Sequence, residues 1–137
     1  MYNLAERVAR TEKVVARFRG HAFSWSNRRT CIHLARAQMR ALGHRPPALP
    51  DMRSALTARR ALKAKGFDDL EALMDSLLPR IAPLEMLPGD LALVPGEGGL
   101  DALAISAGST LLMYHQAADG LVPVKEAIGA VKAAWRV

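Results

Sequence analysis

Cys31 is the residue whose type and position point most directly to chemistry. It is the single cysteine of the chain, and it follows Thr30, a helix-capping residue type, at the start of a predicted helix. A thiol at a helix N-terminus feels the positive end of the backbone dipole and unpaired N–H groups, which favour the nucleophilic thiolate. Arg28 and Arg29 would act in the same direction. The alternative is that Cys31 is a small core residue on an alanine-rich helix.

The histidines close to Cys31 in sequence, and the glycine-rich stretch, offer no second chemical group. His33 stands two residues from Cys31, so the two side chains should lie on different sides of the helix. His21 and His44 fall in predicted loops, and no histidine shows metal-ligand spacing with the cysteine. Residues 95–99 resemble a phosphate loop only in glycine content. We therefore expect neither a metal nor another cofactor.

The hydrophobic pattern predicts an α+β fold, with N-terminal helices packed on a small C-terminal antiparallel sheet. Apolar spacing near 3.6 residues predicts helices over about 3–18, from Cys31 to Gly43, from Ser54 to Gly66, and from Asp68 to near 79–83. Short apolar runs bounded by turn residues predict strands, with a brief helical stretch over 125–131 before the last of them. The predicted strands are Leu91–Val94, Ala102–Ser106, Thr110–Tyr114, Leu121–Val124 and Ala133–Val137.

Length and composition predict a single domain. A chain of 137 residues with 50% hydrophobic residues can fold around one core, which we assign to residues 1–137 with a helical part over about 1–83 and a sheet part over about 84–137. The charged segment 1–16 does not have the apolar stretch of a signal peptide, so we expect synthesis in the cytoplasm. No apolar run approaches the ~20 residues of a membrane span.

Positive charge is concentrated in the first half of the sequence. Residues 1–65 contain 15 Lys and Arg against 3 Asp and Glu, whereas residues 66–137 contain 4 against 10. A solvated arginine-rich surface explains this pattern without a ligand, and nucleic-acid binding is the functional alternative. Aromatic residues are only 5% of the chain, which leaves few platforms for base stacking. Nucleic acid is therefore not the partner that we expect.

Two short motifs occur in the same order as in a known family. A tryptophan-containing loop precedes Cys31 at its helix start, and Leu87-Pro88-Gly89-Asp90-Leu91 opens the predicted sheet. Over about residues 20–125 this order resembles the NlpC-type cell-wall peptidases, which are compact papain-like cysteine peptidases. The resemblance implies a papain-like fold with Cys31 as the candidate nucleophile.

The sequence departs from that family at the position of the catalytic base. The family places its histidine at the start of the next strand, and the matching residue here is Ala102, which cannot accept a proton. Thr30 also replaces the usual aspartate before the nucleophile. The family's third polar position falls on Tyr114 or, with a one-residue shift, on His115, so His115 is a candidate base. A one-residue register change reverses the face of a strand side chain, so the sequence leaves its approach to Cys31 open.

The resemblance extends to a small group of phage and prophage proteins that do not have the catalytic histidine and are encoded among tail genes. It implies a structural or assembly component of the virion tail, with other tail or virion proteins as partners. One alternative is an active cysteine peptidase or amidase that cleaves peptidoglycan peptide stems, with Cys31 as nucleophile and His115 as base. The other is a nucleic-acid-binding module that uses the basic first half.

Overall fold

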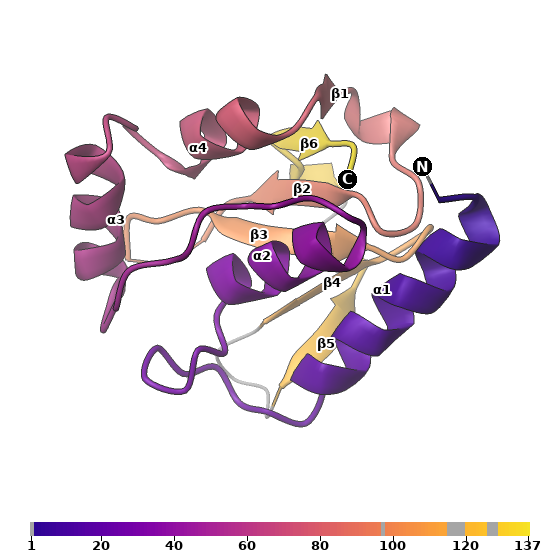
Figure 1. Ribbon diagram of the computed structural model, residues 1–137, viewed down its shortest axis with the longest axis horizontal. Coiled ribbons are helices and arrows are strands. Elements are labelled where there is room, and N and C mark those ends of the chain that lie inside the picture. The colour runs from indigo at the N-terminus through magenta and orange to yellow at the C-terminus, as the bar shows by residue number, and fades with distance from the viewer. Residues whose placement is uncertain (1, 97, 115–119, 126–128) are drawn as a thin grey trace.

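The computed structural model describes residues 2–96, 98–114, 120–125 and 129–137. Within these residues the helices precede the strands, as the sequence predicts, so the chain has an α+β fold (Figure 1). The helices are α1 (Leu4–Phe18), α2 (Cys31–Ala41), α3 (Ala55–Ala64) and α4 (Leu70–Leu77). A 3-10 turn, η1 (Pro83–Glu85), interrupts the strands, which are β1 (Arg80–Ile81), β2 (Leu91–Val94), β3 (Ala102–Ser106), β4 (Leu111–Tyr114), β5 (Leu121–Val124) and β6 (Ala133–Trp135).

All four helices begin after a side chain that accepts a backbone N–H of the first turn, which satisfies a donor that the helix leaves free. The caps are Asn3 with Glu6 (2.9 Å), Thr30 with His33 (3.4 Å), Ser54 with Thr57 (3.2 Å) and Asp69 with Ala72 (2.8 Å). None of the helices in the described part of the chain is long and apolar enough to cross a membrane.

The strands form one antiparallel sheet in the order β1-β6-β2-β3-β4-β5. Pro123 lies in β5, an edge strand, which is where sheets tolerate a residue without a backbone N–H. The sequence did not predict β1, because two residues are too few to show an alternating pattern. The fourth helix ends at Leu77, before the predicted boundary near 79–83. Residues 126–128 of the predicted helical stretch over 125–131 lie outside the described residues.

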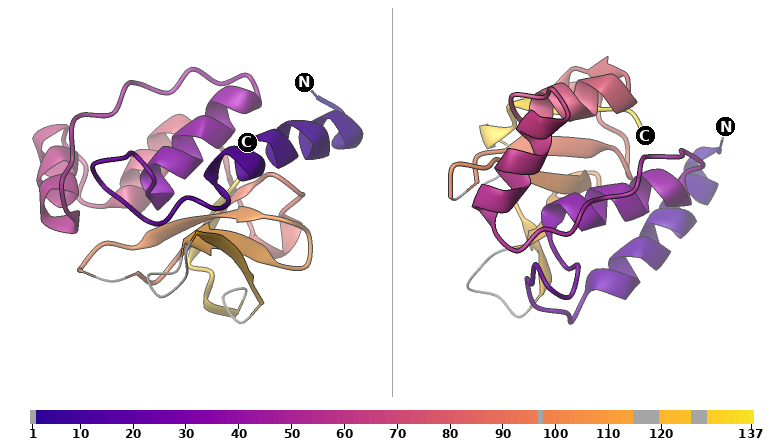
Figure 2. Two further views of the ribbon diagram at one scale, coloured as in Figure 1. Left: turned by 90° about the horizontal axis from the view of Figure 1, so that it is seen from below. Right: turned by 60° about the vertical axis from the view of Figure 1, so that its left-hand side comes forward.

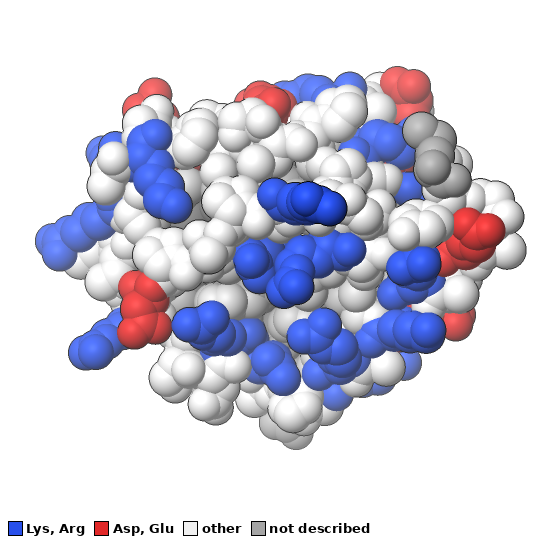
Figure 3. Space-filling model, viewed as in Figure 1, with Lys and Arg blue, Asp and Glu red and all other residues white. Residues whose placement is uncertain are grey.

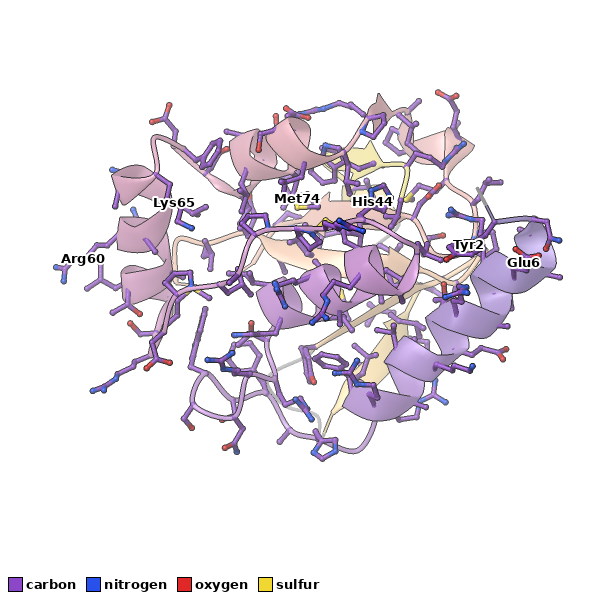
Figure 4. All side chains as sticks on the ribbon, in the orientation of Figure 1. Tyr2, Glu6, His44, Arg60, Lys65 and Met74 are labelled. Carbon is purple, nitrogen blue, oxygen red and sulfur yellow. The ribbon has the colours of Figure 1, made fainter. Side chains whose placement is uncertain are left out.

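The helices cover one face of the sheet (Figure 2, left). On that face Leu93 of β2 and Ile105 of β3 are fully buried in the main core, whereas the alternate residues Ala92 and Ala104 belong to a second apolar cluster. Met74 of α4 is 1% exposed and lies in the interior (Figure 4). Both faces of the central strands are therefore covered, and α2 packs directly on β3.

A buried carboxylate joins the two ends of the chain to the sheet. Asp90 is fully buried in the turn before β2, where it accepts hydrogen bonds from Arg7 of α1 (2.7 Å), from Arg136 (2.8 Å) and from the backbone N–H of Val137 (3.0 Å). Its second oxygen also accepts the N–H of Leu87 (2.9 Å) and so closes its own turn. Arg7 donates in addition to the carbonyl of Val137. The buried charge is thus paired on several sides.

Gly89 in the same turn allows the sheet to approach α1 and α2 closely. Its φ of +93° is in the left-handed region, and a Cβ there would lie 2.7 Å from Thr11 Oγ1. The amide of Gln38, itself fully buried, donates to Thr11 (2.9 Å) and to the carbonyl of Gly89 (2.9 Å). The Pro-Gly-Asp segment is therefore the junction that positions α2 over the sheet.

Candidate functional site

Cys31 lies at the first turn of α2, where that helix meets β3. The cap before it, Thr30, is fully buried, and its Oγ1 lies 2.8 Å from Nδ1 of His33. Cys31 is 8% exposed and packs with Leu34 and Ala35 in the main core. The sequence placed the thiol correctly at a helix start, and the sheet beneath it makes the site a buried one.

A groove of about 320 Å³ reaches the thiol from the surface. We call it the Cys31 groove. Its walls come from the loop before α2, the first residue of α3, the connection between β2 and β3, the beginning of β3 and the end of β4. Cys31, Ala102 and Tyr114 all line it, together with Trp25 and Asp101. The structure therefore brings together the candidate nucleophile and the alanine that stands at the expected position of the base.

Burial raises the pKa of the Cys31 thiol above its ordinary value. Backbone N–H groups of Leu103, Cys31 and Ile32 lower the pKa by a smaller amount. The helix N-terminus thus has the stabilising effect on a thiolate that the sequence predicts, but loss of solvation outweighs it. The thiol is protonated at neutral pH and is not activated for attack.

Two other polar side chains line the Cys31 groove. Asp101 accepts a hydrogen bond from Lys132 Nζ at 2.8 Å, so its charge is already paired. The hydroxyl of Tyr114 is buried without a hydrogen-bond partner among the described residues. Burial raises the pKa of Tyr114 against the opposing effect of Arg29, so the phenol remains protonated. The sequence did not single out Asp101, whose one signal was its place directly before Ala102.

No histidine is among the described residues that line the Cys31 groove. His115, the candidate base from the sequence, follows Tyr114 but lies outside the described residues. His33 lines a different groove, which it shares with Arg28 and Arg29. The two arginines expected to favour a thiolate therefore lie in the wall of that other groove.

That second groove, which we call the basic groove, has a volume of about 530 Å³ and lies between the end of α1, the following loop and α2. Lys and Arg side chains gather on this face of the molecule, and Asp and Glu lie mostly at its periphery (Figure 3). Burial lowers the pKa of His33 first, and the neighbouring Arg28, Arg29 and Arg36 lower it further. His33 is therefore neutral at neutral pH.

The metal-ligating side chains among the described residues of the Cys31 groove are one buried thiol and one paired carboxylate, which is fewer than a zinc site requires. In the part of the chain that the structure describes, no group of three or more His, Cys, Asp or Glu side chains is arranged to hold a metal ion. The groove can enclose a small group beside a neutral thiol and a phenol that lacks a partner. Its described residues include no imidazole, and its one carboxylate, that of Asp101, is paired with Lys132.

Comparison with known families places the chain in one of them. A family model described as Domain of unknown function (DUF6950) matches residues 3–137, and the chain belongs to that family. No curated protein matches it. The match covers both grooves and the Pro-Gly-Asp segment with the buried Asp90, so these features lie within the family's domain.

Proposed function

We propose that this member of the DUF6950 family is a papain-like module that does not hydrolyse peptides and that acts as a structural or assembly component of a phage or prophage tail. The observation that carries the first part is the pairing of Cys31 with Ala102 in one groove. The tail setting rests on the sequence resemblance described above. Other tail or virion proteins are the proposed partners.

The chemistry of cysteine hydrolases supports the absence of hydrolysis. Such enzymes need a thiolate for attack and an acid that protonates the leaving amine, and an imidazole normally serves both steps. Here burial raises the pKa of Cys31, Ala102 lines the same groove at the position where the resemblance places the base, and the carboxylate of Asp101 is bound by Lys132. The described wall of the groove therefore provides neither a thiolate nor the imidazole that normally protonates the leaving amine.

The frame around the groove supports a structural role. Asp90 ties α1, the turn before β2 and the C-terminal residues to one buried point. Gln38 holds α2 to the same turn. A module pinned in this way presents its surfaces in a fixed geometry, which is what an assembly component requires.

Digestion of peptidoglycan tests the absence of hydrolysis. The purified chain is incubated with peptidoglycan and with a synthetic stem peptide, and released fragments are measured by mass spectrometry. We expect no release above that of a Cys31→Ala variant. Release that is lost in Cys31→Ala and also in His115→Ala would establish the peptidase alternative and refute the proposal.

Complementation tests the assembly role. A phage or prophage that has lost the gene is supplied with the wild-type chain or with Cys31→Ala, and assembled tails are counted by electron microscopy. We expect the deletion to reduce tail assembly and both chains to restore it equally. Normal tails in the deletion strain would contradict the assembly role, and restoration by the wild type alone would show that the thiol is required.

A further inference from the structure

The basic groove gathers positive charge that no carboxylate in the described part of the chain neutralises. Five arginines and one histidine line it, and none of the lining residues is Asp or Glu. None of these arginines forms a salt bridge with a described carboxylate. The charged lining residues are Arg17, Arg28, Arg29, His33, Arg36 and Arg40.

Arg29 has a buried polar atom that is left without a partner. Its Nε is buried and makes no hydrogen bond among the described residues. Its Nη1 makes only long contacts, with the carbonyls of Asn27 (3.5 Å) and Arg28 (3.4 Å), and its guanidinium lies 5.0 Å from the centre of the Phe18 ring. A buried donor on a charged group is costly unless an acceptor reaches it. The Nη2 group of Arg29 is not among the buried atoms and makes no hydrogen bond with a described residue, so it is the donor that an oxyanion in the groove would meet.

The loop before α2 holds two consecutive arginines at this wall at the expense of backbone strain. Ser24 and Arg29 exchange two backbone hydrogen bonds of 2.9 Å, which close the turn. Within it Arg28 has a φ of +57°, the only non-glycine residue in the described chain with a left-handed backbone. Strain of this kind persists where the surrounding structure fixes it, and it is frequent at ligand sites. Arg36 is fixed from the opposite side by its bond to the carbonyl of Pro47 (3.0 Å).

We propose that the basic groove binds a compact anion that carries several phosphate groups. A guanidinium is a planar fork that matches phosphate oxygens, and five of them converge on a space of about 530 Å³, which is within the usual size of ligand pockets. Phe18 is the only aromatic residue among those that line it, so the groove has little surface for stacked bases. This favours a small polyphosphate over a nucleic-acid strand. The site is separate from the Cys31 groove, so the proposal holds whether or not the chain cleaves peptides.

Titration with inorganic tripolyphosphate tests the site. Binding to the full chain is measured by calorimetry at low salt, with Arg29→Gln and Arg36→Gln as variants. Arg60→Gln is the matched control, because Arg60 lies on α3 and points away from the body of the molecule (Figure 4). We expect each groove variant to weaken binding by about tenfold or more, since a charge-assisted bond is lost. Arg60→Gln should leave the Kd within about twofold.

Folding of the variants is checked by the NMR signals of His33, which must also shift when tripolyphosphate binds the wild-type chain. A single-stranded DNA of mixed sequence is titrated in parallel to separate the two sources of phosphate. We expect a lower Kd for tripolyphosphate than for the DNA when both concentrations are expressed per phosphate group. The proposal is overturned if tripolyphosphate does not bind at millimolar concentration, if Arg60→Gln weakens binding as much as Arg29→Gln, or if DNA binds more tightly.

Discussion

The Cys31 groove and the basic groove lie on either side of the first turn of α2, and they differ in how their polar groups are satisfied. In the Cys31 groove the thiol is protonated, Ala102 stands where the sequence resemblance leads us to expect a base, and the carboxylate of Asp101 is paired. In the basic groove the arginines are concentrated and have no carboxylate partners among the described residues. Among the described residues, the position that resembles an active site thus has a protonated thiol and no imidazole, whereas the surface that resembles plain solvated charge is the one that we propose binds a ligand.

The two halves of the sequence also differ in whether their charged side chains are paired with an opposite charge. In the second half Arg80 pairs with Glu71 and Asp75, and Lys132 pairs with Asp101. Among the described residues, Arg7 is the one arginine of the first half that pairs with a carboxylate, through its bond to Asp90. Charges that are paired within the fold are already used by the structure, whereas the unpaired arginines on one wall remain available to an anion from outside.

The largest effect is expected at the junction that fixes both grooves to one frame. Asp90→Ala leaves the guanidinium of Arg7, which is only 7% exposed, without its partner. Loss of one member of a buried ion pair costs about 3–5 kcal/mol, so we expect the free energy of unfolding to fall by that amount. Urea denaturation measures it. A loss below about 1 kcal/mol would show that the two grooves do not depend on this junction.

A histidine at the base position should change the Cys31 groove from an inert to a reactive site. In Ala102→His an imidazole enters the groove that already contains Cys31. A neighbouring imidazolium stabilises the thiolate, so alkylation by iodoacetamide at pH 7 should become about tenfold faster. Ala102→Gln, which is of similar size but cannot be protonated, serves as the control. Equal rates in the two variants would show that Ala102 does not face the sulfur.

The Arg28→Gly substitution should raise the stability of the chain and at the same time weaken anion binding in the basic groove. Arg28→Gly relieves a left-handed backbone and removes one of several like charges. We expect thermal denaturation to show a gain of about 1 kcal/mol, together with weaker tripolyphosphate binding. Asn27→Gly, at a position with ordinary backbone angles, should give no gain. If Arg28→Gly destabilises the chain, the strain at this residue does not serve a ligand.

The smallest effect is expected where a paired charge is exposed. Glu71→Gln removes one of the two carboxylates that bind Arg80, in a pair whose side chains are 41% and 37% exposed. Exposed ion pairs contribute little, so the free energy of unfolding should fall by less than about 1 kcal/mol. Chemical denaturation in low and moderate salt measures this change. A larger loss of unfolding free energy would mean that the ion pairs of the second half contribute substantially to the stability of the whole fold.

The sequence predicts most of the fold because the local signals agree with the tertiary structure. Thr30 and Ser54 cap helices where the pattern places their starts, and β2 to β5 follow short apolar runs between turn residues. The strand β1 is missed because its two residues pair with β6, a partner far away in sequence. Local patterns contain no information about such a pairing.

The candidate site is predicted less completely, because its properties depend on how deeply each side chain is buried and on the direction in which it points. Arg28 and Arg29 are close to Cys31 in the sequence. The turn from Ser24 to Arg29, however, directs them to the basic groove. The burial that raises the pKa of Cys31 comes from the contact between α2 and β3, which no local motif encodes. The paired Asp101 is likewise recognisable only once Lys132 is placed beside it.

The pH dependence of Cys31 alkylation tests the central claim that the thiol is not activated. The pKa of this group is raised in the folded chain, so the protonated thiol stabilises the fold below its ordinary pKa of about 8.5, and this stabilisation is lost as the pH rises through the higher folded value. We predict slow alkylation at neutral pH, with a midpoint above 8.5 in the native protein and near 8.5 in urea. A native midpoint well below 8.5, with fast alkylation at pH 7, would contradict the account.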